Sequence, residues 1–167
     1  MTDRDIAAQN RELANHLSNN LGRLLKEFAR DYENRVQDLL NQRGHPDIRP
    51  PHSTIFANLG TGAVRVTELA ERAQVTQQAM GKMLKELERL GYLERAVDGS
   101  DRRAREIRLT ERGISLVRDS LQAIQEVQAY YRHKAGAENL EALETQLRGV
   151  ISSLQFQNLP DTWTEGR

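Results

Sequence analysis

The chain has 167 residues, of which 38% are hydrophobic and 29% are charged, a balance that suits a highly charged, helix-rich protein. It contains no cysteine, which excludes a disulfide framework, a thiol redox switch and a cysteine-based zinc site. Its 24 lysines and arginines are matched by 24 aspartates and glutamates, so the protein is not a bulk polycation. No apolar run approaches the roughly 20 residues that cross a bilayer, and the N-terminus lacks a signal-peptide pattern. We therefore expect a cytoplasmic protein with no membrane partner.

The first long segment, residues 3–43, predicts an α-helix with one apolar face. Its apolar residues recur at steps of three, four or seven with no proline between them, namely Ile6, Leu13, Leu17, Leu21, Leu24, Leu25, Phe28, Tyr32, Val36, Leu39 and Leu40. Gly44 is placed to end this helix, and the segment HPDIRPP after it cannot continue one. We expect residues 1–44 to form an N-terminal dimerisation helix, followed by a short helix over residues 52–59.

The C-terminal part, residues 114–156, shows the same amphipathic pattern. Thr110 is placed as the N-cap of a helix that carries Ile114, Val117, Leu121, Ile124, Val127 and Tyr131. After a break near Gly136, a second helix carries Leu140, Leu143, Leu147, Val150, Ile151 and Leu154. We expect residues 157–167 to be a mobile tail.

Two helical arms with this much apolar surface favour a homodimer joined through the arms. The alternative is a monomeric bundle in which the two arms pack on each other. We expect a dimer interface that draws leucines from both arms: Leu13, Leu17, Leu140, Leu143, Leu147 and Leu154.

The middle segment, residues 52–113, has a different pattern and predicts a DNA-binding domain. Thr67 is placed to cap a short helix (TELAERA), and after a brief turn Thr76 is placed to cap a longer helix that ends at Gly91. Two apolar-alternating runs, YLERAV and IRLT, then flank an Asp-Gly turn, which predicts a β-hairpin. This order of elements is a winged helix-turn-helix. The predicted fold is therefore mainly α with a small β wing, flanked by N- and C-terminal dimerisation helices.

The longer helix carries the residues that we expect to enter a DNA major groove. They are polar or small, and residues 76–85 contain no acid: Thr76, Gln77, Gln78, Gly81, Lys82 and Lys85. Glutamine can bond adenine edges bidentately, and the two lysines suit phosphates. Gly81 inside a helix costs about 1 kcal/mol relative to alanine, which indicates either close approach to DNA or tight packing on a neighbouring helix. A merely polar helix surface is the simpler alternative.

The hairpin tip, DGSDRRARE over residues 98–106, places several arginines beside a turn. Read in isolation it is a solvated, charged turn. After a helix-turn-helix it becomes a wing, because arginine suits the narrow, electronegative minor groove. Asp101 can orient the Arg103 guanidinium, while Arg102, Arg105 and Arg108 suit the DNA backbone.

Residues 66–113 resemble the winged helix-turn-helix of the MarR family of bacterial and archaeal transcriptional regulators. The resemblance rests on four short motifs: ELA at residues 68–70, L-x-x-x-G-Y-L-x-R at residues 87–95, D-x-x-D-R-R at residues 98–103 and L-T-x-x-G at residues 109–113. It implies a homodimer on a pseudo-palindromic operator in double-stranded DNA, often acting as a repressor, with Arg103 in the minor groove. It also implies effectors such as small aromatic acids, bound between the arms and the DNA-binding domain. The family wing often has an arginine where Ser100 stands, which implies fewer DNA contacts at this tip.

Other signals have simpler explanations. Residues 60–62 (GTG) are expected to be a turn and not a nucleotide site. His45, Asp47 and His52 are near enough in sequence to share a metal, but solvated loop histidines are the ordinary case, so we expect no metal and no cofactor. No Ser/His/Asp or paired-carboxylate arrangement has supporting context, so we do not expect an enzyme. The main alternative function is a winged-helix module that binds protein, which would favour exposed apolar residues on the second helix.

Overall fold

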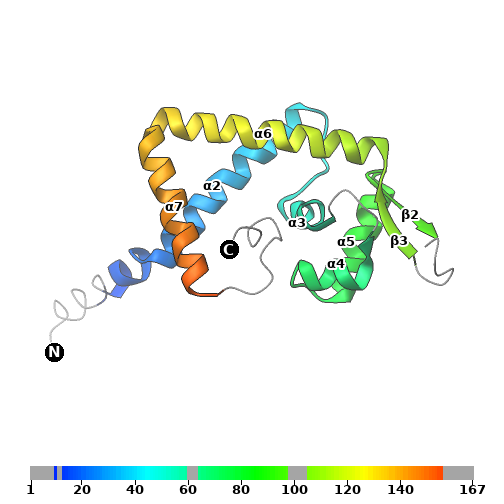
Figure 1. Ribbon diagram of the computed structural model, residues 1–167, viewed down its shortest axis with the longest axis horizontal. Helices are drawn as coiled ribbons and strands as arrows, with labels where there is room; N and C mark the ends of the chain where they lie inside the picture. The colour runs from blue at the N-terminus through cyan, green and yellow to red at the C-terminus, as the bar shows by residue number, and fades with distance from the viewer. Residues whose placement is uncertain (1–9, 11–12, 60–63, 98–104, 156–167) are drawn as a thin grey trace.

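The computed structural model describes residue 10 and residues 13–59, 64–97 and 105–155. In chain order the elements are α2 (Leu21–Gln42), α3 (Pro50–Leu59), β1 (Val64–Arg65), α4 (Val66–Arg72), α5 (Gln77–Arg89), β2 (Leu93–Val97), β3 (Arg105–Leu109), α6 (Glu111–Ala135) and α7 (Ala137–Ser153). Figure 1 shows two parts: a winged lobe, which contains α3 to α5 and the hairpin of β2 and β3, and an arm, made of residues 13–18, α2, α6 and α7. The strand β1 also belongs to the lobe. The predicted fold class, mainly α with a small β wing, is confirmed.

The helix of the N-terminal arm is interrupted at Asn20. Residues 13–18 are helical and a bend follows; the extended Asn20 then caps α2 by accepting a 3.0 Å hydrogen bond from the Arg23 N–H. The prediction of one continuous helix over residues 3–43 is therefore wrong here, because a short polar side chain competes for the backbone N–H groups although the apolar spacing continues. At the other end Gly44 follows α2 with φ of +91°, as expected of a residue that ends a helix.

The winged lobe contains a three-stranded antiparallel sheet in the order β1-β3-β2. The register of the predicted hairpin runs from Leu93 opposite Leu109 to Val97 opposite Arg105. The chain enters this hairpin through Gly91, which ends the α5 corner with φ of +78°.

The strand β1 is too short to show an alternating pattern, and the sequence did not predict it. Val64 pairs with Ile107, so β1 forms the outer strand beside β3. Because β1 leads directly into α4, that helix begins at Val66 and has no side-chain cap. The prediction that Thr67 caps it is wrong.

The arm joins the winged lobe where α6 begins against the corner between α5 and β2. Thr110 caps α6 by accepting a 3.1 Å hydrogen bond from the Gly113 N–H, as predicted, and its hydroxyl donates to the Gly91 carbonyl at 2.6 Å. A Cβ on Gly113 would lie 2.1 Å from the Tyr92 carbonyl oxygen. Only glycine therefore lets the first turn of α6 come this close to the lobe.

The apolar stripe expected on α6 divides between buried and exposed residues. Val127 of this stripe is buried, together with Leu116 and Ala123, whereas Ile114 and Leu121 of the same stripe are exposed. The helix carries apolar residues on more than one face, so spacing could not decide which face packs inward. Contacts with α2 and with the lobe decide it.

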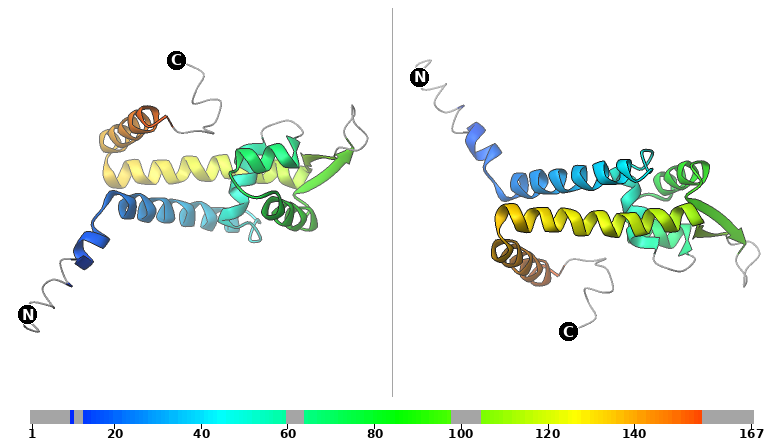
Figure 2. Two further views of the ribbon diagram at one scale, coloured as in Figure 1. Left: turned by 90° about the horizontal axis from the view of Figure 1, so that it is seen from below. Right: turned by 90° about the horizontal axis from the view of Figure 1, so that it is seen from above.

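Within the arm, α2 and α6 lie side by side and run antiparallel (Figure 2). The Tyr131 hydroxyl on α6 donates to Asp31 on α2 at 2.6 Å, and Arg35 pairs with the same carboxylate at 2.7 Å. Burial and the adjacent Asp31 carboxylate raise the pKa of Tyr131 to about 12. These polar contacts fix the two long helices against each other.

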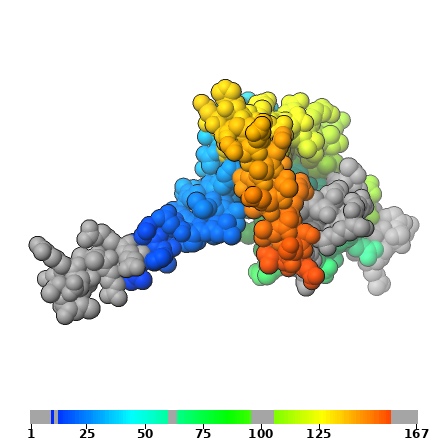
Figure 3. Space-filling model, turned by 60° about the vertical axis from the view of Figure 1, so that its left-hand side comes forward, coloured from blue at the N-terminus to red at the C-terminus, as the bar shows by residue number. Residues whose placement is uncertain are grey.

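The last helix, α7, turns back from α6 at Gly136 and lies at the surface of the molecule (Figure 3). Among the leucines predicted for a dimer interface, Leu140 is only 7% exposed because α7 packs against α6 there, so a partner could not reach it. Leu147 is half-buried, and the rest are exposed: Leu13, Leu17, Leu143 and Leu154. Over the described part of the chain, none of the helices combines the length and apolarity needed to span a membrane.

Candidate nucleic-acid interface

The amphipathic helix α5 presents the predicted DNA-contacting residues on its polar face. Thr76 caps the helix, as predicted, by accepting a 3.1 Å hydrogen bond from the Ala79 N–H. The opposite face buries Met80, Leu84 and Leu87 completely, which fixes the rotation of the helix about its axis. The exposed residues that result are Thr76, Gln77, Gln78, Lys82 and Lys85, with Gly81 half-buried among them.

An open hollow of about 610 Å³ lies along this polar face. Its described lining consists of Thr76, Gln78, Ala79, Gly81, Lys82 and Lys85. The structure thus brings five of the predicted residues together, while Gln77 is exposed outside the lining. Ala79 was not predicted, because only polar residues and glycine were considered; its spacing of three from Lys82 was the available signal.

The acidic residues of α5 are held away from the hollow by their own partners. Glu86 binds the Arg49 guanidinium, and Glu88 pairs with Arg95 at 2.5 Å. Lys82 and Lys85, in contrast, form no ion pair with any residue that the structure describes. The polar face therefore carries two cations that no described carboxylate neutralises.

Gly81 has open space where its side chain would be. A Cβ built there would meet no described atom within 4 Å. Of the two explanations that the sequence left open, tight packing on a neighbouring helix is not seen among the described residues. Close approach to DNA stays a prediction.

The hairpin of β2 and β3 projects from the winged lobe (Figure 1), and its last described pair is Val97 opposite Arg105. The tip residues Asp101, Arg102 and Arg103 lie outside the described residues, so their roles stay predictions. The backbone of Arg105 belongs to β3, which places it at the base of the tip. Further along the same strand, Arg108 is exposed and pairs with Glu106 at 2.9 Å.

A cavity of about 200 Å³ lies where the arm meets the winged lobe. Apolar side chains dominate its wall, and the full lining is Tyr32, Glu33, Val36, Gln37, Leu40, Ile48, Arg49, Pro50, Ser53 and Ile124. Arg49 is the cation of this wall, and its guanidinium also binds Glu86 of α5. The wall of the cavity therefore contacts α5, the helix that carries the polar face, through the ion pair between Arg49 and Glu86.

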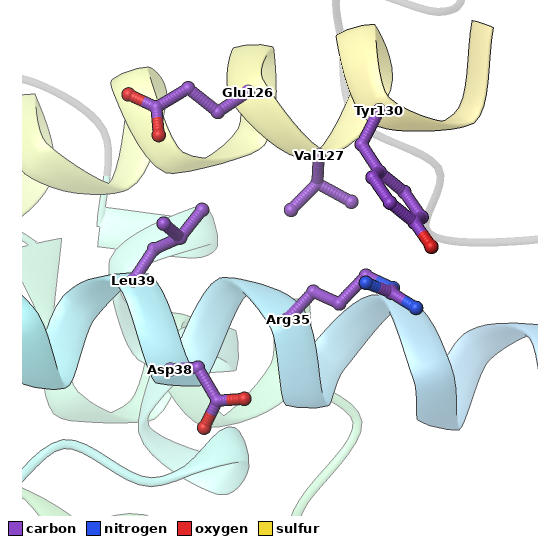
Figure 4. A pocket seen from close by; sticks show the side chains of 6 residues that line it. All are labelled: Arg35, Asp38, Leu39, Glu126, Val127 and Tyr130. Carbon is purple, nitrogen blue, oxygen red and sulfur yellow. The ribbon is translucent and has the colours of Figure 1, made fainter. Parts of the chain in front are cut away.

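A second cleft, of about 280 Å³, lies between α2 and α6 (Figure 4). Arg35 reaches toward the Tyr130 ring and lies 4.0 Å from its centroid, whereas Asp38 points away from α6. Glu126 is paired with Arg43 at 2.6 Å. Because its charged groups are bonded within the arm or directed away, this cleft belongs to the packing of the arm.

The three residues considered as metal ligands have separate partners. His45 contacts Tyr92 and Asp119, Asp47 lies 3.6 Å from Arg112, and His52 lies beside Glu86. Within the described ranges, no three side chains of metal-binding type come together.

Comparison with known proteins agrees with this geometry. The MarR family model matches residues 47–104, which contain α3, the helix-turn-helix and the β2 strand. The exopolysaccharide II synthesis transcriptional activator ExpG of Rhizobium meliloti is 26% identical over 125 residues, covering 75% of this chain. The aligned region spans 63% of the length of ExpG, somewhat less than two thirds.

Two solved structures show the same fold. The Mycobacterium tuberculosis MarR family protein Rv2887, in complex with salicylic acid, is 25% identical with a TM-score of 0.60, over 78% of this chain and 96% of Rv2887. The transcriptional repressor CouR, bound to a 23-mer DNA duplex, is 22% identical with a TM-score of 0.65, over 80% of this chain and 94% of CouR. The shared fold and the element order show that the chain has a winged helix-turn-helix fold. Residues 47–104 of it are similar to the MarR family.

Proposed function

We propose that this chain is a homodimeric transcriptional regulator that binds double-stranded DNA in a sequence-specific way. The polar face of α5 carries the proposal: it combines two glutamines, two lysines that no described carboxylate neutralises, and a glycine that no contact within the described chain requires. MarR-family regulators are non-enzymatic and need no cofactor. The face therefore serves binding, and catalysis is not expected of it.

The chemistry of this face suits the DNA major groove. The groove admits an α-helix, in which Gln77 and Gln78 can bond adenine edges and Lys82 and Lys85 can contact phosphates. A face that bound protein would instead present apolar side chains. The DNA-bound CouR structure supports this choice, since CouR shares the fold. We place the protein in the cytoplasm, with the DNA.

We propose that the wing supplies the minor-groove contact. In this role Arg103 enters the groove, Asp101 orients its guanidinium, and Arg102 and Arg105 contact the backbone. The hairpin projects from the same lobe as α5, so both grooves are within reach of one subunit.

We propose that the second subunit joins through the arm. Leucines on the N-terminal part of the arm and on α7 are exposed, including Leu17 at 76% and Leu154 at 61%. A two-fold dimer would hold two copies of α5 on half-sites about one helical turn apart, which matches a pseudo-palindromic operator. Bound over a promoter, such a dimer represses by blocking access.

We propose that the junction cavity binds a small aromatic acid as effector. Its wall is mostly apolar, and Arg49 is available to pair with a carboxylate. An acid bound there would compete with Glu86 for the Arg49 guanidinium, and so act on α5. The salicylic acid complex of Rv2887 supports this class of ligand.

Selection of genomic fragments by the purified protein tests the function, followed by fluorescence anisotropy on the selected duplex. Lys82→Ala with Lys85→Ala should weaken binding for every sequence, and should lower the slope of log affinity against log salt by about 2. Matched controls are Lys26→Ala and Lys134→Ala, which remove exposed lysines of the arm. Failure to enrich any fragment would favour a protein-binding module, and an unchanged salt slope would remove the lysines from the interface.

A further inference from the structure

A hydrogen-bonded chain of three side chains, two of them buried and one (Asp119) partly exposed, joins the arm to the winged lobe. His45, in the loop after α2, is 4% exposed. Its Nδ1 lies 3.1 Å from the hydroxyl of Tyr92, next to β2, and its Nε2 lies 2.9 Å from a carboxylate oxygen of Asp119 on α6. These two hydrogen bonds therefore connect α6 and the loop that follows α2 to the corner of the lobe at Tyr92.

A neutral imidazole satisfies every bond of this chain. With the proton on Nε2, His45 can donate to Asp119 while its Nδ1 accepts a hydrogen bond from the Tyr92 hydroxyl. Both bonds are directional, and a buried polar atom left without a partner is costly. Tilting the lobe against the arm would break at least one of them.

Residues at the start of α6 also contact the corner around Tyr92. The Arg112 guanidinium lies 4.3 Å from the centroid of the Tyr92 ring and donates to the Leu90 carbonyl at 2.6 Å. Gly113 brings the backbone of α6 against the Tyr92 carbonyl. These contacts anchor the lobe to α6, and His45 adds α2, so that the orientation of the lobe is fixed from two sides.

We infer that the Asp119–His45–Tyr92 chain is a positioning element that sets the angle between the winged lobe and the arm. In the proposed dimer this angle fixes the separation and rotation of the two α5 helices. His45 and Tyr92 are thus positioning residues for half-site spacing, although neither contacts DNA. The inference rests on the proposed function and adds a determinant of operator geometry to it.

The experiment measures affinity for duplexes in which the selected half-sites are moved apart or together by one or two base pairs. Each inserted base pair turns one half-site by about 34° relative to the other, so the parent protein should lose about tenfold in affinity per step. Tyr92→Phe removes the hydroxyl that forms the hydrogen bond with Nδ1 of His45. His45→Gln keeps an amide near the Nε2 position but loses the bond to Tyr92. For both variants, affinity should change by less than about threefold for each base pair added to or removed from the half-site spacing. Both should keep the parent's affinity for an isolated half-site.

Two further variants separate positioning from a general loss of stability. Tyr131→Phe removes an equivalent hydroxyl that bonds Asp31 within the arm, and it should keep the spacing preference of the parent. Asp119→Asn retains an oxygen that accepts from His45 and should preserve discrimination, whereas Asp119→Ala should lose it. Thermal unfolding confirms that each variant is folded at the assay temperature.

The outcomes separate the two proposals. If the parent binds no DNA, the proposed function fails. If the parent discriminates spacing and Tyr92→Phe and His45→Gln do so equally sharply, the positioning role is overturned and the function stands. A parent that tolerates every spacing, or a Tyr131→Phe variant that loses discrimination to the same extent, also overturns the positioning role.

Discussion

Gly81 and Gly113 are both helical glycines, but they lie in different surroundings. At Gly113 a Cβ would lie 2.1 Å from the Tyr92 carbonyl oxygen, so glycine is what lets α6 meet the lobe. At Gly81 a Cβ would meet no described atom within 4 Å. Since glycine inside a helix costs about 1 kcal/mol relative to alanine, nothing within the described chain compensates for Gly81. A requirement of the bound state does so in our proposal.

Gly81→Ala should therefore change stability and binding in opposite directions. The free energy of unfolding should rise by about 1 kcal/mol, because alanine favours the helix. Affinity for the operator should fall about tenfold, because the added methyl group occupies space that the groove edge needs. Urea unfolding measures the first quantity and fluorescence anisotropy the second.

Gly149 on α7 provides the control, since it is also a helical glycine with no described atom within 4 Å of a built Cβ. Gly149→Ala should stabilise the protein to a similar extent and leave DNA affinity unchanged. If the Gly81→Ala variant binds DNA as tightly as the parent, α5 does not approach the DNA closely at this position.

His52 links stability to pH. It is 1% exposed, and burial lowers its pKa below the ordinary 6.5 by more than the nearby Glu86 carboxylate raises it. The unfolded chain therefore binds this proton more tightly than the folded chain. The stability due to neutral His52 is complete above about pH 6.5 and is lost progressively as the pH falls below that value.

We expect the Tm to decrease between about pH 7.5 and pH 5, and to decrease less in His52→Gln. Thermal unfolding across this range measures the difference. His133→Gln, which removes an exposed histidine of α6, should retain the full decrease. Identical pH profiles for the parent and His52→Gln would remove His52 as a cause.

At the scale of elements, local signals predicted most boundaries because each depends on residues that are close in sequence. Thr76 and Thr110 cap α5 and α6, and Gly91 ends the α5 corner, as the sequence indicated. One error lies where the apolar pattern continues across a local interruption, at Asn20. On α6, packing decides which residues of the expected apolar stripe are buried. The two-residue strand β1 forms only because it pairs with β3, which is distant in sequence, so the residues of β1 themselves show no strand pattern.

Parts of the candidate interface that depend on local sequence could be predicted, and parts that depend on distant contacts could not. The polar face of α5 could be predicted, because the buried stripe fixes the rotation of the helix. The chain of His45, Tyr92 and Asp119 could not, because its members are far apart in sequence and only the folded molecule brings them together.

The two threonine caps should differ in their contribution to stability. Thr76→Ala loses one capping bond and should lower the free energy of unfolding by about 1 kcal/mol. Thr110→Ala loses its capping bond and also the bond to the Gly91 carbonyl, and should cost about 2 kcal/mol. Urea unfolding compares them, and equal costs would mean that the bond between α6 and the lobe adds nothing to stability.

At the scale of the whole molecule, the arm presents more apolar surface than its own helices cover. Leu17, Leu21 and Leu24 are exposed by 76%, 66% and 65%. A monomer rarely exposes apolar patches beyond a few hundred Å². The monomeric bundle would require these side chains to pack on α6 or α7, and the described contacts leave them open to solvent. In the proposed dimer, a second copy of the arm would supply a matching surface by symmetry.

Leu24→Glu should therefore weaken dimerisation by about 100-fold or more, because each interface would bury the new charge twice without a partner. Asn34→Glu adds the same charge to an exposed polar site of α2 and should leave the dimer intact. Sedimentation velocity over a concentration series measures the dissociation constant, and footprinting on the operator should show protection shrinking from two half-sites to one. A parent that sediments as a monomer at all concentrations, or a Leu24→Glu variant that dimerises as tightly as Asn34→Glu, would exclude the arm as the interface. The two copies of α5 would then need another means of reaching adjacent half-sites.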